Sequence, residues 1–373
     1  MQRIEKYIYQ QDDWPNFKWD FEKLTPLLAQ VRHLQGKLIG KMESLGFDLR
    51  SEANLETLTL EALKSNEIEG EILNSEQIRS SLARRLGMDI SGLVASDRNV
   101  DGVVDMMLDA TLHYQQSLSE DRLFGWQSAL FPTGRSGMSK IIVGSFRDDT
   151  NGPMLVVSGT IGRERVHFEA PAAIQLKKEI AAFIRWFNNE NDLDSVLKAG
   201  LAHFWFVTIH PFDDGNGRIA RTITDMLLAR SDGVSQRFYS MSAQIRKERK
   251  QYYDVLEKSQ KGGLNITDWL EWFLNCLYNT LNASEKILER VLIKHQFWNK
   301  NATAILNSRQ VLMLNKLLDG FTDKMTSSKW AKITKCSADT ALRDIQDLIK
   351  KQVLKKDLAG GRSTNYELKR IQE

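Results

Sequence analysis

The chain has 373 residues, 42% of them hydrophobic and 27% charged, which is the composition of an ordinary soluble globular protein. This length exceeds what one hydrophobic core usually supports, so we expect two or three domains. The net charge of +3 is too small to indicate a nucleic-acid partner for the chain as a whole. Cys276 and Cys336 lie far apart and lack metal-ligand spacings, which argues against a disulfide framework or a zinc site and fits a reducing compartment.

The N-terminal stretch MQRIEKYIYQQDDW lacks the apolar segment of a secretory signal. No apolar run approaches the ~20 residues that cross a bilayer. We therefore expect a cytoplasmic protein without a membrane partner.

Helical periodicity dominates the first ninety residues. After an entry segment at 14–19, apolar residues at spacings of three and four predict one long amphipathic helix: Phe17, Phe21, Leu24, Leu28, Val31, Leu34 and Leu38. A second helix is predicted over 55–68, stopping at Gly70, and a third over 75–86 after a cap-like Asn74.

Residues 125–171 differ in character, because they hold many of the glycines. The stretch MLVVSGTIGRERVHFEAP predicts two short extended runs around a Gly-Arg-Glu turn, which we interpret as a β-hairpin or flap. Helices then resume, and the nearly all-apolar VLKAGLAHFWFVTIH predicts a central buried helix that ends at His210. Further helices are predicted from about Gly217 and from Ile266 to Leu281.

The last segment is basic, since residues 305–373 contain 14 Lys or Arg and 8 Asp or Glu. Helices predicted over 309–318, 327–334 and 337–351, followed by an extended tail turning at Gly360 and Gly361, are typical of a winged helix-turn-helix. Its basic residues would neutralise DNA phosphates, whereas Asp339, Asp344 and Asp347 would oppose that contact if they faced the groove. Both DNA binding and protein docking therefore stay open for this module.

The segment HPFDDGNGRIAR, residues 210–221, concentrates reactive side chains. Gly215 and Gly217 around Asn216 let the backbone N–H groups approach an anion, and the helix that follows adds a favourable dipole. Arg218 and Arg221 share one face of that helix and can grip neighbouring phosphates.

The same segment supplies a base and a metal ligand. Asp214 could hold Mg²⁺, which usually keeps one or two protein carboxylates and bridges substrate phosphates. His210 can act as a base near neutral pH, and Phe212 between them suits a buried anchor. The alternative is a capped helix after a polar loop with a core histidine, but the whole set predicts phosphoryl or nucleotidyl transfer, without the motif of a P-loop.

These twelve residues match every position of the signature of Fic-domain proteins, H-P-F-x-[DE]-G-N-G-R-x-x-R, so the chain resembles that family. The resemblance implies transfer of AMP from ATP to a Ser, Thr or Tyr hydroxyl of a target protein, with release of pyrophosphate. It implies that His210 deprotonates the hydroxyl and that Asp214 binds Mg²⁺. The residues implied to contact the α-, β- and γ-phosphates are Gly215, Asn216, Gly217, Arg218 and Arg221.

The resemblance also assigns the flap, which in the family pairs with the target as an added strand. Its candidate contacts to nucleotide and target are Arg165, Val166, His167 and Phe168, with an ordinary surface hairpin as the alternative. Tyr252 and Tyr253 resemble family tyrosines near the adenine, although such a pair is often part of a core. Gln260 stands where some relatives have an asparagine, which affects the base and ribose contacts.

The segment SNEIEG, residues 65–70, fits the pattern [ST]-x-x-x-E-[GN] of the inhibitory helix that some Fic proteins carry before the core. A Glu69 carboxylate against Arg221 would occupy the guanidinium that should grip the γ-phosphate, and Ser65 would help hold the helix end. The alternative is a solvated helix end. In some relatives this glutamate instead positions a water that removes AMP from a modified target.

We therefore expect a mainly α-helical protein: an N-terminal helical region with the inhibitory helix over 1–89, a Fic core with a β-hairpin flap over 90–300, and a winged helix-turn-helix over 305–373. The expected function is autoinhibited, Mg²⁺-dependent AMP transfer from ATP to protein hydroxyls, including its own. The alternatives are a DNA-binding regulator that uses the Fic core as a nucleotide sensor, a transferase that uses another donor, and removal of AMP. The resemblance also implies a homodimer.

Overall fold

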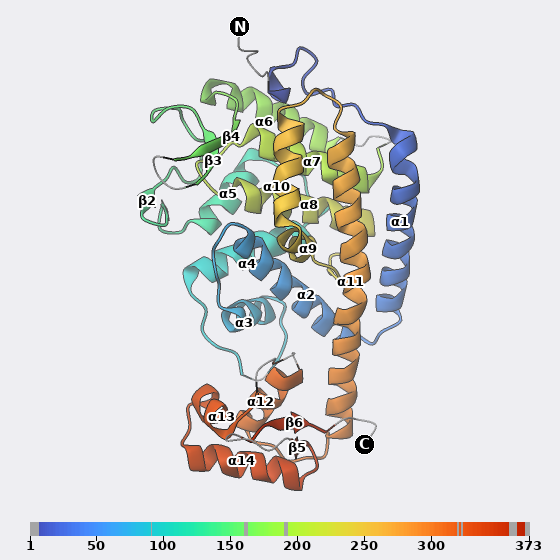
Figure 1. The fold of residues 1–373 in the computed structure, drawn as a ribbon, viewed down its shortest axis with the longest axis vertical. Coiled ribbons are helices and arrows are strands. Elements are labelled where there is room, and N and C mark those ends of the chain that lie inside the picture. The colour runs from blue at the N-terminus through green and yellow to red at the C-terminus, as the bar shows by residue number, and fades with distance from the viewer. Residues whose placement is uncertain are drawn as a thin grey trace.

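The structure, a computed structural model, describes residues 7–90, 92–159, 163–189, 193–318, 321, 324–357 and 364–369 (Figure 1). A short 3₁₀ turn, η1 (Ile8–Gln10), comes first. The α-helices are α1 (Phe21–Glu43), α2 (Phe47–Ile68), α3 (Ser75–Arg85), α4 (Arg98–Leu112), α5 (Glu120–Leu130), α6 (Ala173–Asn188), α7 (Ser195–Ile209), α8 (Asn216–Asp232), α9 (Met241–Lys247), α10 (Arg249–Gln260), α11 (Thr267–Lys300), α12 (Ser308–Leu318), α13 (Ser327–Thr334) and α14 (Ala338–Lys350). The prediction of a mainly helical protein is confirmed.

The strands form three antiparallel pairs. They are β1 (Arg135–Ser136) with β2 (Ser139–Lys140), β3 (Leu155–Ser158) with β4 (Arg165–Glu169), and β5 (Leu354–Lys356) with β6 (Tyr366–Leu368). The second pair is the predicted flap, and a register shift between Val156 and Val157 bends it.

Helix α7 is the centre of the core. Every residue from Val196 to Ile209 is buried, as its all-round apolar sequence predicts, and α8, α6 and α11 pack against it (Figure 1). One continuous hydrophobic cluster extends from Ile8 to Val291. The N-terminal helices therefore share this core, and the boundaries drawn at 89 and 90 stay a prediction.

Two helix starts and one helix end differ from the sequence pattern. Helix α1 begins at Phe21 because Asp20 caps it by accepting from the Lys23 amide, so Phe17 lies before the helix. Helix α2 begins eight residues earlier than predicted, at Phe47. Helix α11 continues beyond Leu281 to Lys300 as one helix of 34 residues, the long orange helix of Figure 1.

The C-terminal module has its own hydrophobic cluster. Trp330, Ile345 and Leu354 meet Phe297, which lies near the end of α11. Three helices and a hairpin follow each other in the predicted order, while the assignment as a winged helix-turn-helix stays a prediction. The predicted turn at Gly360 and Gly361 lies outside the described residues.

Two aspartates of α14 turn toward the module itself. Asp344 accepts from Arg309 Nε at 2.7 Å and from Asn307 at 2.8 Å, and Asp347 accepts from Gln310 at 2.8 Å. Arg309 compensates the charge of Asp344, and Lys351, at 2.5 Å, compensates that of Asp347. Within the described ranges, no helix has the length and apolar character that a membrane crossing needs.

Candidate functional site

The signature segment forms a tight loop between α7 and α8. His210 caps α7 in the left-handed conformation, with φ of 51°, and its N–H donates to the Phe206 carbonyl at 3.0 Å. The Asn216 amide closes the loop, since it accepts from the Phe212 N–H at 3.0 Å and donates to the Phe212 carbonyl at 2.8 Å. The Asn216 side chain therefore shapes the loop, and buried Phe212 anchors it as expected.

The His210 imidazole is held as a neutral base. Its Nδ1 lies 3.2 Å from the Val207 carbonyl, so the proton resides on Nδ1 and Nε2 keeps a lone pair. Burial lowers the pKa of His210 to about 4, with the Arg147 charge acting in the same direction. The ring is thus uncharged at neutral pH and can accept a proton at Nε2.

Gly215 and Gly217 line an anion-binding turn at the start of α8. Gly215 has φ of 91°, and a Cβ there would come within 3.0 Å of the Phe131 ring. A Cβ at Gly217 would collide with the Glu69 carboxylate, so this carboxylate lies directly on the turn. An anion therefore already occupies the place where helix N-termini bind phosphate.

Asp214 lies beside this turn and is 41% exposed. Its carboxylate accepts from the Ser136 hydroxyl and lies 3.8 Å from Arg218 Nη2. One exposed carboxylate next to a phosphate-binding turn fits Mg²⁺, which takes its remaining ligands from phosphates and water.

Arg218 and Arg221 are both almost fully buried at the same face of α8. Arg218 Nη1 donates to Glu71 at 2.7 Å, and its guanidinium stacks over the Phe131 ring at 4.9 Å. Nε of Arg218 and Nη1 of Arg221 are buried and have no hydrogen-bond partner among the described residues. These two N–H groups are thus placed to donate to an anion at this face of α8.

Glu69 caps the end of α2 and pairs with Arg221. Arg221 Nη2 donates to Glu69 Oε1 at 2.7 Å and to the Ser65 carbonyl at 2.9 Å, while Nε donates to the Ser65 hydroxyl at 2.9 Å. The end of α2 thus occupies three of the donor positions of one guanidinium. The structure brings together Ser65, Glu69 and Arg221 as the sequence pattern predicts.

The flap residues point in different directions. Val166 is 43% exposed and pairs with exposed Val157 across the hairpin. Phe168 is buried against the rings of Tyr7 and Tyr9, at centroid distances of 5.1 and 5.9 Å, so it faces the N-terminal segment. Of the four predicted flap residues, Arg165 and Val166 are exposed on the hairpin, and Val166 is the exposed apolar one.

Arg165 and His167 tie the flap to α10. Both bond the Glu257 carboxylate, Arg165 Nη2 at 2.9 Å and His167 Nδ1 at 2.6 Å. Although partial burial acts to raise it, hydrogen bonds from Lys261, His167 and Arg165 lower the pKa of Glu257 to about 2. The charged Glu257 therefore fixes the flap against α10.

The two tyrosines have separate environments. Tyr252 is buried, and its hydroxyl lies 3.0 Å from Nε2 of His203, whose Nδ1 lies 2.9 Å from the Thr224 hydroxyl of α8. Tyr253 is 37% exposed, with the Arg249 guanidinium 5.5 Å from its ring centroid. Gln260 donates to Thr208 at 3.3 Å and is buried. Tyr253 is thus the accessible ring of the pair.

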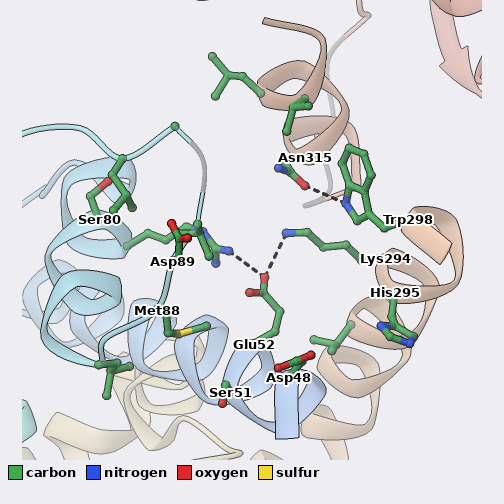
Figure 2. A pocket seen from close by; sticks show the side chains of 18 of the residues that line it. Asp48, Ser51, Glu52, Ser80, Met88, Asp89, Lys294, His295, Trp298 and Asn315 are labelled. Carbon is green, nitrogen blue, oxygen red and sulfur yellow. Dashed lines mark hydrogen bonds and ion pairs between the residues drawn. The ribbon is translucent and has the colours of Figure 1, made fainter. Parts of the chain in front are cut away.

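A cavity of about 930 Å³ lies at the other end of α2, away from the signature loop (Figure 2). Helices α2, α3, α11 and α12 line it. At its centre Glu52 accepts from Arg79 Nη2 at 2.8 Å and from Lys294 at 3.1 Å (Figure 2). One turn further along α2, Glu56 pairs with Arg290 at 2.6 Å, so two ion pairs hold α2 to α11.

Comparisons with known proteins match two parts of the chain. The profile of the Fic/DOC family matches residues 117–228, and that of a domain of unknown function, DUF4172, matches residues 7–88. The protein adenylyltransferase Fic of Drosophila grimshawi is 35% identical over 102 residues, which are 27% of this chain and 20% of that protein. The chain therefore matches only a fifth of this relative's length.

The fold also resembles solved structures. A Fic family protein from Desulfovibrio desulfuricans G20 aligns with a TM-score of 0.51 and 18% identity, over 93% of this chain and 95% of that chain. A Fic domain containing signaling protein from Bacteroides thetaiotaomicron VPI-5482 aligns with a TM-score of 0.50 and 20% identity, over 70% of this chain and 98% of that chain. The helical arrangement described above is thus that of Fic-family structures.

Proposed function

Taking as premise that this chain contains a Fic domain, we propose that it transfers AMP from ATP to hydroxyl side chains of proteins and that Glu69 inhibits this reaction. The observation that carries the proposal is the arrangement at the start of α8. A neutral His210, a glycine turn and two arginines with unsatisfied donors surround a position that a carboxylate now occupies.

In the proposed reaction the triphosphate lies on the turn of Gly215 and Gly217. Asp214 would hold Mg²⁺, which neutralises phosphate charge when bound. Nε2 of His210 takes the proton of the target hydroxyl, the hydroxyl oxygen bonds the α-phosphorus, and the bond to the pyrophosphate oxygen breaks. The helix N-terminus and Arg218 stabilise the charge of the departing pyrophosphate.

The pairing of Glu69 with Arg221 supports inhibition. A triphosphate that reaches Arg221 must displace this carboxylate, so the wild-type protein binds ATP weakly or in an unproductive position. The exposed pair of Val157 and Val166 supports docking of an extended target segment along the flap.

The test is label transfer from α-labelled ATP with Mg²⁺, comparing wild type, Glu69→Gly, and Glu69→Gly with His210→Ala. We expect weak labelling in the first, strong labelling in the second, and a loss of about 10²- to 10⁴-fold in the third, because a general base contributes that much. If the second variant binds ATP but transfers nothing, the proposed transfer is wrong. Assays with other nucleotide donors and with an AMP-modified target then separate the remaining alternatives, a different donor, a sensor and AMP removal.

A further inference from the structure

Arg147 is a fully buried cation next to the signature loop that the reaction described above does not use. It lies between α5 and the flap, and its side chain has 0% exposure. Its Nη1 donates to the Asp149 carboxylate at 3.0 Å, which compensates the charge. Burying a guanidinium costs desolvation free energy even when a carboxylate compensates its charge. What it offers in return is a rigid fork of donors that holds several acceptors in a defined geometry.

The remaining donors of Arg147 hold the loop that carries the base. Nε donates to the His210 carbonyl at 2.8 Å, and the backbone N–H of Arg147 donates to the Pro211 carbonyl at 3.0 Å. His210 has φ of 51°, which residues other than glycine rarely adopt and which persists only where the surroundings enforce it. Arg147 thus holds the carbonyl groups of both His210 and Pro211 in place.

The same guanidinium reaches the end of the flap. Nη2 of Arg147 donates to the Pro171 carbonyl at 2.5 Å, two residues after β4. The partner Asp149 accepts from the Ala173 N–H at 2.6 Å, so it also holds the start of α6. One side chain therefore connects the base to the end of the hairpin along which the target would lie.

We propose that Arg147 is a positioning residue that fixes the His210 imidazole relative to the flap, and hence to the target hydroxyl. This inference rests on the proposed AMP transfer. The expected nucleotide contacts come from Asp214 to Arg218 and from Arg221, and Arg147 donates no hydrogen bond to these residues in the described structure. Its loss should therefore slow the transfer step and leave ATP binding unchanged.

The test uses the full chain in the Glu69→Gly background, with Arg147→Met and Arg147→Lys. We expect kcat to fall about 100-fold in Arg147→Met, since a shift of about 1 Å in a reacting group costs that much. The Kd for ATP should stay within about threefold of the background. Loss of the cation also removes an influence that lowers the pKa of His210, so the acid limb of the pH–rate profile should move to higher pH.

Arg122→Met is the matched control. The Arg122 side chain is 10% exposed and bonds the Asp109 carboxylate at 2.6 Å and the Asp109 carbonyl at 2.8 Å, but it joins α5 to α4. We expect it to lower the melting temperature without moving the pH profile. If Arg147→Met does not fold, Arg147→Lys, which keeps the charge but cannot bond three oxygens in the same fork, should still show a reduced kcat.

The outcomes separate this inference from the proposed function. If the Glu69→Gly background itself transfers no AMP, the function is wrong. If the background is active and both Arg147 variants keep kcat within about threefold, the positioning role is wrong. It is equally wrong if kcat falls as far in Arg122→Met, or if the loss is in ATP affinity alone.

Discussion

The two ends of α2 each place a glutamate against cationic side chains, yet only the end with Glu69 lies on the signature loop. Glu69 Oε1 contacts Arg221 at 2.7 Å, and Glu52 contacts Arg79 at 2.8 Å. Arg221 sits on the anion-binding turn with one donor unsatisfied among the described residues, whereas Arg79 and Lys294 join α2 to α3 and α11. Under the proposed function, an ion pair of this kind would inhibit where its cation also binds nucleotide and would only stabilise the fold where it does not.

Replacing Glu69 should have the largest effect on activity. We expect Glu69→Gly to raise the rate of AMP transfer about 5- to 150-fold, the range of a typical coupling free energy between sites. Its control is Glu67→Gly, two residues earlier on α2, where the carboxylate pairs with Lys64. Labelling that rises equally in both variants would mean that a loosened helix, and not the Arg221 contact, is responsible.

Replacing Glu52 should affect stability instead. Glu52→Gln leaves Arg79 and Lys294 without their carboxylate at a site where Glu52 is 20% exposed. We expect the free energy of unfolding in urea to fall by about 1–3 kcal/mol. AMP transfer in the Glu69→Gly background should change less than twofold. A rise in transfer comparable with that of Glu69→Gly would show that both ends of α2 control the site.

The Glu52 contribution should depend on pH. Burial acts to raise the pKa of Glu52, but Arg79 and Lys294 lower it below the ordinary value of 4.5. A carboxyl with a lower pKa in the folded state stabilises the protein above its unfolded pKa and loses that contribution as the pH falls. The stability difference between wild type and Glu52→Gln should be full at pH 7 and shrink below about pH 4.5. A difference that grows on acidification would contradict this assignment.

The smallest effect is expected at an exposed ion pair on the same helix as Lys294. Glu285 of α11 pairs with Lys41 at 2.8 Å, and both side chains are over 40% exposed. Glu285→Gln should shift the melting temperature by less than about 2 °C, because exposed pairs contribute little. A larger shift would indicate that contact between α1 and α11 also depends on this charge.

Sequence reasoning located the reactive loop and the opposing glutamate because each is a short pattern of spaced side chains. It did not find Arg147, Glu257 or Glu71, because the partners that give them their roles, the His210 carbonyl, His167 and Arg218, lie far away in the sequence. A buried arginine whose partners are backbone carbonyls produces no periodic pattern in the sequence. Arg147 stands between the apolar stretch 141–143 and the polar stretch 148–150, so its place in the sequence does not set it apart.

The directions in which side chains point could also not be predicted from the sequence. Alternation along β4 could not show that Phe168 would be buried by the N-terminal tyrosines, because those residues are remote in the chain. Nor could the acidic residues of α14 be assigned to the outside or inside of the module. The length of α11 was underestimated, since its apolar pattern weakens where it leaves the main core.

Helix α11 is a continuous, rigid connection between the main core and the C-terminal module. With 34 residues at about 1.5 Å each, it is a rod of about 51 Å that is anchored in the core near Trp269 and ends in the C-terminal module near Phe297. The main core packs along this helix as far as Val291, so only its last residues, up to Lys300, lead into the C-terminal module. Because α2 is joined to the same helix by Lys294 and Arg290, one rigid element connects the C-terminal module with the helix that carries Glu69.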